Sequence, residues 1–296
     1  MSKSDNIYIR LTDKIIEKMK GGVAPWQKPW ALKHLPQNFI SKKRYNGFNM
    51  VAVMMEERDC PYWATFKQIK SLGGSLKKGE HGIPIVYYMF IDKDTGKPHK
   101  PGEPKSNNSI PVPRYYVIFN LEQTEGIEWE LPETNIVENS NIDEEVIRYC
   151  ELEGISISFT DTNDKAYYAP KLDCIHVPKK SNFVTENHFF ATCFHEMVHS
   201  TGIEKRLNRG LDIETRRFGD HLYSKEELVA EFGSCFLMAN YGIFDDSVFD
   251  NSTAYLQGWA KRLEDQPSVL VSAANQAQKA VDFILGVNNE EEEIGE

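Results

Sequence analysis

Residues 195–199, HEMVH, place two histidines four positions apart with a glutamate directly after the first. On a helix, positions i and i+4 lie on one face about one turn apart, so both imidazoles can reach one ion while Glu196 projects beside it. Zinc suits imidazole ligands, and a catalytic zinc keeps one position for a water whose pKa falls towards about 7. The spacing therefore predicts that His195 and His199 bind one Zn²⁺ per chain, or another divalent transition metal, and that Glu196 is the general base.

A third ligand must come from elsewhere, because the next histidine after His199 is His221. The segment 224–241 has helical character and repeats Glu227 and Glu231 on one face. We favour Glu227 as the third ligand and Glu231 as a carboxylate that orients a ligand imidazole, and the reversed assignment stays open. Either assignment predicts a His, His, Glu site of the gluzincin type.

Further predictions concern residues around this segment. Ser224 precedes Glu227 by three positions, as in a capping box, so Glu226 is expected only to complement the helix dipole. Tyr223 and His221 are candidate donors to a tetrahedral oxyanion. The strand-like run 173–178 could present an edge to an extended peptide substrate. His176, within that run, is expected to be structural.

Charge is distributed unevenly along the chain. Residues 1–120 hold 20 Lys and Arg against 10 Asp and Glu, a net charge of +10, whereas residues 121–296 hold 14 against 34, a net charge of −20. The basic part could meet a polyanion, which the acidic part would repel. The alternative is that the two parts simply attract each other.

Cations alternate with aromatic rings in the basic part, which is the mixture that single-stranded nucleic acid requires. Phosphates need positive charge, and unstacked bases need flat partners worth about 1–3 kcal/mol each. No recognition-helix or finger motif favours duplex DNA. Other rings, such as Phe48, Phe66 and Tyr87, are expected to belong to the core. The candidate DNA-contacting residues are Lys28, Lys42, Lys43, Arg44, Tyr45, Trp63, Lys67, Lys77 and Lys78.

Hydrophobic periodicity and turn residues predict an α+β fold in two domains. In the first domain we expect helices at 7–20, 46–58 and 63–73, strands at 83–91 and 114–120, and an exposed loop at 92–113. In the second we expect a helix at 143–152, β-like runs at 155–161 and 166–178, and helices at 185–202, 224–241, 253–264 and 267–285.

Composition excludes several protein classes. A chain of 296 residues with 41% hydrophobic and 26% charged residues is typical of a globular protein of two domains. The five cysteines are widely spaced without a CxxC pair, so free thiols are expected rather than disulfides or a thiolate zinc cluster. No apolar run reaches the roughly 18 residues of a membrane span, and the N-terminus lacks a secretory signal. We therefore expect a soluble cytoplasmic protein with no membrane partner.

Several stretches together resemble the antirestriction proteins of the ArdC type, which are encoded on mobile elements. The stretches cover nearly the whole chain and are LTDKIIEKMKGGVAPWQKPW, RYNGFNM, WATFKQIKSLGGSLKKGEHGIPIVYY, VIFNLEQTEG, AYYAPKLDCIHVP, FFATCFHEMVHSTGIEKRLNR, RRFGDHLYSKEELVAEFGSCFL and YLQGWAKRLEDQPSVLVSAANQAQKAVDFIL.

The resemblance implies a basic domain at 1–125 that binds single-stranded DNA and a zincin-like metallopeptidase domain at 143–287. The acidic stretch 126–142 between them contains Pro132 and has no helical period, so it is expected to be a linker. The acidic segment 288–296 is expected to be disordered. The resemblance also implies that the protein shields incoming DNA from host restriction during plasmid or phage transfer. It assigns His195 and His199 as ligands and Glu196 as the catalytic acid and base, and takes the third ligand from EELVAE.

The function we predict is therefore that of an antirestriction protein that binds single-stranded DNA and cleaves an unknown protein substrate with zinc. The alternative is a non-enzymatic DNA-binding protein with a structural metal. A metal-dependent nuclease is a weaker third possibility, because it would need carboxylate-rich ligation of a hard cation.

Overall fold

The structure is a computed structural model, and its described residues run from 3 to 287 with gaps. They are 3–21, 34–56, 58–99, 108–131, 141–161, 165–211, 221–243, 259–261, 263–264 and 266–287, with backbone only for 3–8, 10 and 221–224. Helices and strands are both abundant, and the predicted α+β class with two domains is confirmed. Among the described residues, no helix combines the length and apolar character needed to cross a membrane.

The N-terminal half is built of helices and mostly antiparallel strands, with β1 and β2 pairing in parallel. Its main sheet has the order β1-β2-β5-β4, and β4 and β5 form a long hairpin with ten paired positions, from Ile83 with Ile118 to Asp92 with Ser109. Its elements are α1 (Lys3–Lys20), β1 (Gln37–Asn38), α2 (Gly47–Met54), β2 (Tyr62–Thr65), α3 (Phe66–Ser71), β3 (Ser75–Leu76), β4 (Ile83–Asp92), β5 (Ser109–Asn120), the 3-10 turn Leu121–Gln123 and β6 (Thr124–Glu125).

The C-terminal half packs helices on a small sheet of order β7-β9-β8, in which β7 runs parallel and β8 antiparallel to β9. Its elements are α4 (Ile142–Glu153), β7 (Ser156–Thr160), β8 (Tyr167–Ala169), β9 (Cys174–Pro178), the 3-10 turn Lys180–Asn182, α5 (Glu186–Ser200), α6 (His221–Asn240) and α8 (Ser268–Leu285). Residues 259–261 and 263–264 are also helical, and the rest of the predicted helix 253–264 lies outside the described residues.

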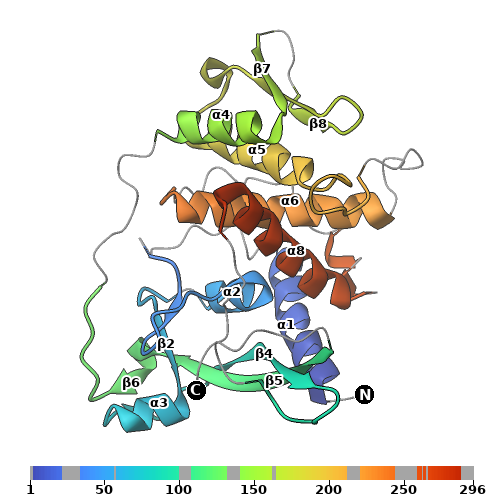
Figure 1. The fold of residues 1–296 in the computed structure, drawn as a ribbon. Helices are drawn as coiled ribbons and strands as arrows, with labels where there is room; N and C mark the ends of the chain where they lie inside the picture. The colour runs from blue at the N-terminus through green and yellow to red at the C-terminus, as the bar shows by residue number, and fades with distance from the viewer. Residues whose placement is uncertain are drawn as a thin grey trace.

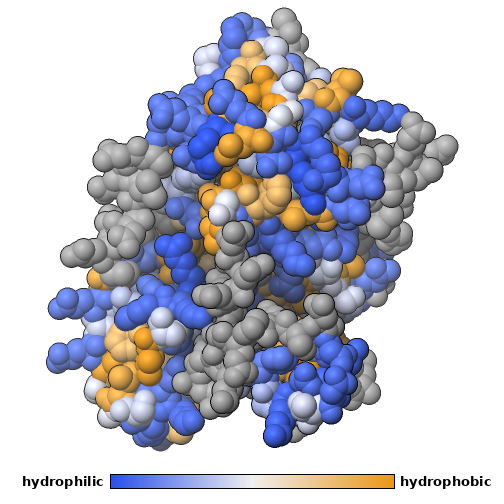
Figure 2. Space-filling model, in the orientation of Figure 1, coloured by the Kyte–Doolittle hydropathy of each residue, from blue (hydrophilic) through white to orange (hydrophobic). Residues whose placement is uncertain are grey.

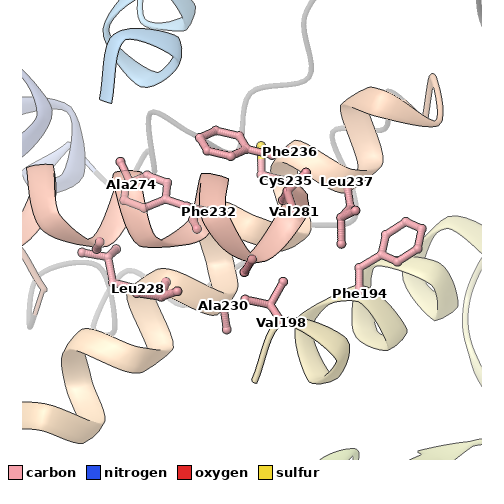
Figure 3. Packing of buried hydrophobic residues seen from close by; sticks show 14 of the residues in the cluster. Phe194, Val198, Leu228, Ala230, Phe232, Cys235, Phe236, Leu237, Ala274 and Val281 are labelled. Carbon is pink, nitrogen blue, oxygen red and sulfur yellow. The ribbon is translucent and has the colours of Figure 1, made fainter. Parts of the chain in front are cut away.

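The core of the C-terminal half lies between α5, α6 and α8, and Figure 3 shows the apolar side chains that these helices contribute. Gly233 of α6 allows a close approach to α5, because a Cβ atom at this position would lie 2.6 Å from Cγ2 of Val198. Glycine weakens a helix interior by about 0.5–1 kcal/mol relative to alanine, so its use here reflects packing. The close contact brings α6 against the part of α5 that carries the histidines.

The two halves share this core. Side chains of α1 and α2, among them Ile15, Met19 and Phe48, belong to the same buried cluster as α8. Figure 1 shows α1 and α2 between the sheet of the N-terminal half and α8. The domain boundary along the sequence is therefore not a boundary of the hydrophobic core.

The predicted helix 63–73 is wrong in its first part. Residues Tyr62–Thr65 form β2, which pairs with β1 and β5, and the helix α3 begins only at Phe66. The Thr65 side chain accepts a hydrogen bond from the N–H of Gln68, and the Gln68 side chain accepts one from the N–H of Thr65. This capping box places the strand-to-helix boundary at Thr65.

The predicted loop 92–113 is also partly wrong, because β5 begins at Ser109 and includes Pro111 and Pro113. Over Ser109–Val117, β5 pairs with β4 on one side only. On its other side β5 pairs with β2, and this pairing involves only the last three residues of β5, from Ile118 to Asn120. Proline is tolerated in such an edge position, since the missing N–H is not needed for a second ladder. The turn signals of this segment therefore concealed a strand.

The run 173–178 does not present an edge. It contains β9, which pairs with β7 on one side and β8 on the other, so its backbone groups are already used. The prediction that this run binds an extended peptide is wrong, and in the described sheet β7 and β8 are the outer strands.

Candidate metal centre

Helix α5 brings His195 and His199 together as their spacing predicts. The Thr185 side chain accepts a hydrogen bond from the N–H of His188 and caps the start of the helix. One turn separates the two ligand candidates, and their Nε2 atoms lie 3.0 Å apart. Both imidazoles therefore point at one position.

Helix α6 adds Glu227 at that position. Its Oε2 lies 3.7 Å from Nε2 of His195, and its Oε1 lies 3.5 Å from Nε2 of His199. One ligand atom from each of the three residues can be chosen so that all lie within 4.8 Å of one another. Ligands at about 2.0–2.1 Å from a tetrahedral ion are themselves about 3.3 Å apart, so the donor set fits a divalent transition metal.

Glu231, one helical turn after Glu227, faces the other side of His195. Its Oε1 is 4.0 Å from Nδ1 of His195, while Glu227 lies at Nε2. Burial raises the pKa of Glu231, and the His195 imidazole opposes this rise. The arrangement is that of a carboxylate behind a ligand histidine.

The electrostatics of the site favour a cation. Burial lowers the pKa of His195, but the nearby carboxylates of Glu227, Glu231 and Glu196 outweigh it and raise the pKa to about 9. Glu196 itself follows His195 on α5 and is only 7% exposed. The carboxylates around His195 therefore favour a positive charge at this position, whether it is carried by a proton or by a metal ion.

The sequence did not indicate the role of Glu226. Because α6 begins at His221, Ser224 lies inside the helix and cannot be its N-cap, and Glu226 lies beyond the first turn. Oε1 of Glu226 is 3.5 Å from Nδ1 of His199, and its carboxylate pairs with Arg209. Burial raises the pKa of Glu226, but Arg209 and His199 outweigh it, so the pKa is lowered. The dipole assignment of Glu226 is therefore wrong.

Other predicted residues lie apart from the metal group or outside the described atoms. His176 shares hydrogen bonds with Ser158 and Thr160 and stacks on Tyr167, in agreement with a structural role. The backbone of Tyr223 and of His221 belongs to α6, but their side chains lie outside the described atoms.

The predicted DNA-contacting cations are mostly on the surface. Lys42, Arg44, Lys67, Lys77 and Lys78 are exposed and Lys43 is half-buried, whereas Lys28 lies outside the described residues. Nζ of Lys42 lies over the rings of Phe39 and Tyr62, at 4.2 and 4.3 Å from their centroids. Burial lowers the pKa of Lys42.

The two aromatic residues predicted to stack on bases, Tyr45 and Trp63, are buried, unlike the predicted cations that the structure describes. Tyr45 and Trp63 are 3% and 2% exposed and belong to a core cluster with Val53 and Ile118, so neither can stack on a base without leaving the core. Phe66, expected in the core, is 50% exposed, and Nζ of Lys70 lies 5.7 Å from its ring centroid. Figure 2 shows a hydrophobic patch with hydrophilic neighbours where Figure 1 places α3 and β6. The expectation that Phe66 lies in the core is therefore wrong: Phe66 is the first residue of α3, and its ring is half exposed.

Comparisons with known proteins cover both halves. Residues 5–119 match the family model of the N-terminal domain of the anti-restriction factor ArdC, and residues 146–276 match a zincin-like metallopeptidase family. Two DNA primases TraC of Escherichia coli are each 34% identical over 93% of this chain, which spans only 27% and 19% of their lengths. The uncharacterized protein y4eC of Sinorhizobium fredii is 27% identical over 94% of this chain and 91% of its own.

Solved structures match nearly the whole chain. The antirestriction ArdC protein from the R388 plasmid, in a metal-free and a Mn(II)-bound crystal structure, is 31% identical with a TM-score of 0.73, over 95% of this chain and 97% of its own. The two family models match successive, non-overlapping parts of this chain. This protein therefore belongs to the ArdC family of antirestriction proteins, and its C-terminal half is a zincin-like metallopeptidase domain.

Proposed function

We propose that this protein protects incoming DNA by joining a module for single-stranded DNA to a zinc-dependent peptidase. The observation that carries the peptidase part is the convergence of His195, His199 and Glu227 on one position, with Glu196 buried beside them. The three residues hold the ion, and Glu231 orients His195. A bound Zn²⁺ supplies Lewis acidity towards a scissile carbonyl and lowers the pKa of a water molecule.

Glu196 is the residue that accepts and returns a proton. Its place on α5, directly after a ligand histidine, keeps the carboxylate next to the site without occupying a ligand position. Proton transfer by a positioned side chain contributes about 10²–10⁴-fold to a rate. The Glu196→Gln variant should therefore lose at least 100-fold in hydrolysis while keeping its metal.

The test compares wild type, Glu196→Gln and Glu186→Gln, an exposed glutamate at the start of the same helix. Each protein is loaded with Zn²⁺, its metal content is measured, and cleavage of a quenched fluorescent peptide library is followed. Glu186→Gln should behave as wild type. Hydrolysis retained by the metal-loaded Glu196→Gln variant would refute the assignment.

The alternative is a DNA-binding protein whose metal has only a structural role. A structural zinc has four protein ligands, whereas a catalytic one leaves a position to water. The group found among the described residues supplies three donors, which favours the catalytic reading. Water-proton relaxation of the Mn²⁺-loaded protein separates the two: a large enhancement indicates an exchanging water on the ion, and no enhancement favours the structural role.

For the N-terminal half we propose a single-stranded DNA surface around α3. The exposed Phe66 ring offers a stacking platform, and the exposed cations Lys67, Lys70, Lys77 and Lys78 follow along the same segment. Stacking and phosphate neutralisation are the two terms that single-stranded DNA needs. Tyr45 and Trp63 are excluded because they are buried.

This surface is tested by fluorescence anisotropy, with oligo(dT) and the 296-residue chain at several salt concentrations. Phe66→Ala should weaken binding about 5- to 150-fold, which corresponds to about 1–3 kcal/mol. Lys67→Ala should reduce the slope of log K against log salt by about 0.7. The matched control is Leu72→Ala, an exposed aliphatic residue just after α3, which should have little effect. Binding that is insensitive to salt and to Phe66→Ala would contradict this surface.

A further inference from the structure

Behind the ligand His199 lies a buried ion pair that joins two distant segments. Nε of Arg209 donates to Oε2 of Glu226 at 2.9 Å, and Nη2 donates to Oε1 at 2.6 Å. Each side chain is only 6% exposed. Two parallel hydrogen bonds between a guanidinium and a carboxylate fix orientation as well as charge, so the Glu226 carboxylate is held in one place.

The remaining donors of Arg209 bind the end of the ligand helix. Nη2 donates to the carbonyl of Val198 at 2.8 Å, and Nη1 donates to Oγ1 of Thr201 at 2.7 Å. The backbone N–H of Arg209 also donates to the carbonyl of Gly202 at 2.8 Å. Arg209 therefore connects the last turn of α5, which carries His199, with the carboxylate on α6.

Glu226 and Glu227, which are consecutive on α6, lie next to the two different ring nitrogens of His199. Oε1 of Glu227 is 3.5 Å from Nε2 of His199, and Oε1 of Glu226 is 3.5 Å from Nδ1. The buried Nδ1 has no closer hydrogen-bond partner among the described residues. Hydrogen bonds of catalytic groups are often long in unligated structures and shorten when the site is filled.

We propose that Arg209 and Glu226 are positioning residues for His199. Glu226 accepts a hydrogen bond from the Nδ1–H of His199, which leaves Nε2 as the lone-pair nitrogen that faces Glu227, and Arg209 holds Glu226 in place. The inference rests on the proposed function only in that His195, His199 and Glu227 bind the metal. It does not depend on peptide hydrolysis or on DNA.

The expected effect is on metal affinity. Partners of ligand histidines are worth about 10- to 100-fold in metal binding. Glu226→Gln and Arg209→Met should therefore weaken Zn²⁺ and Mn²⁺ binding by this factor. Arg209→Lys should lie between them and wild type, because a lysine cannot donate two parallel hydrogen bonds.

The double variant Arg209→Met/Glu226→Met distinguishes a role in positioning His199 from a role in fold stability alone. Replacing a buried ion pair by apolar side chains often restores stability, whereas removing one partner does not. If the pair only stabilises the fold, the double variant regains metal affinity together with stability. If the pair positions His199, the double variant regains stability but still binds metal weakly.

The experiment is a competition between each variant of the 296-residue chain and a chromophoric chelator for Zn²⁺ and Mn²⁺, with unfolding of the metal-free proteins measured in parallel. Ring ¹⁵N chemical shifts of wild type should show His199 protonated at Nδ1, and Glu226→Gln should change this tautomer distribution. Metal affinity within twofold of wild type in Glu226→Gln and in the double variant would overturn the inference. If wild type itself bound no metal, the metal site of the proposed function would fail first. Weakened metal binding in a protein without peptidase activity would support the inference and contradict only the peptidase.

Discussion

Asn275 of α8 caps the helix α2 in the other half of the chain. Its side-chain oxygen accepts a hydrogen bond from the backbone N–H of Phe48 at 3.1 Å. The side chain of Gln278, also on α8, accepts one from the N–H of Gly47 at 3.1 Å. The N-cap residue Asn46 makes no capping hydrogen bond of its own. The amide groups at the start of α2 are therefore satisfied from the metallopeptidase domain.

Asn275→Ala should destabilise the whole protein. The substitution leaves the N–H of Phe48 without its acceptor, and loss of a helix cap costs about 0.5–2 kcal/mol. Chemical denaturation, followed by circular dichroism, measures the change in the free energy of unfolding. Lys279→Ala, at an exposed position of the same helix, is the control and should change stability by less than about 0.5 kcal/mol. An equal effect of both variants would contradict the capping role.

Gly47→Ala should be more damaging than Gly73→Ala, although both glycines have positive φ, +52° and +80°. Any side chain is strained at such angles, but a Cβ at Gly47 would also lie 2.4 Å from Oδ1 of Asn275, whereas nothing lies within 4 Å of one at Gly73. We expect about 1 kcal/mol of strain for Gly73→Ala and clearly more for Gly47→Ala. Similar unfolding free energies for the two variants would show that Asn275 of α8 moves away from the new Cβ atom at no measurable cost in stability.

Asp173 should make stability depend on acid pH. Burial raises the pKa of Asp173, but hydrogen bonds from Arg206, Lys205 and Tyr168 outweigh it and lower the pKa to about 2. Since the unfolded value is about 3.9, the charged Asp173 stabilises the fold above about pH 4, and this contribution is lost as the pH falls towards 2.

The variant that tests this is Asp173→Asn, because asparagine tolerates the positive φ of 48° at this position. It should be less stable than wild type at pH 7, and the difference should shrink between about pH 4 and pH 2. The control is Asp161→Asn, whose ion pair with Lys179 is exposed. Its effect should be at most about 1 kcal/mol. A difference between wild type and Asp173→Asn that does not change with pH would contradict the charge effect.

Metal binding should raise the thermal midpoint. An ion that binds only the folded state stabilises it by about 2.7 kcal/mol at a free concentration 100 times its Kd. Differential scanning calorimetry with Zn²⁺ or Mn²⁺ should show this shift in wild type and in Glu196→Gln, and a chelator should reverse it. Glu227→Ala should lose most of the shift, whereas Lys225→Ala, two positions earlier on α6, should keep it. An undiminished shift in Glu227→Ala would place the ion elsewhere.

Some features of the site follow from the sequence because they depend on local geometry. Two histidines four residues apart on one helix must share a face, so the meeting of His195 and His199 could be predicted without a structure. The repeat of Glu227 and Glu231 likewise indicated which helix would complete the group. The α+β class followed from hydrophobic periods of the same local kind.

Other features depend on which segments pack together, and only the tertiary structure decides them. Trp63 has an aromatic ring of the kind that stacks on bases, but its strand β2 lies between β1 and β5, and its ring is buried. Arg209 has no distinctive motif, and its role arises because the chain after α5 folds back to bind both α5 and Glu226. The hydrophobic period of a helix or strand indicates which of its faces is apolar, but not which other element packs against that face. The packing partner is determined by contacts between residues that are distant in the sequence, and no local sequence pattern encodes these contacts.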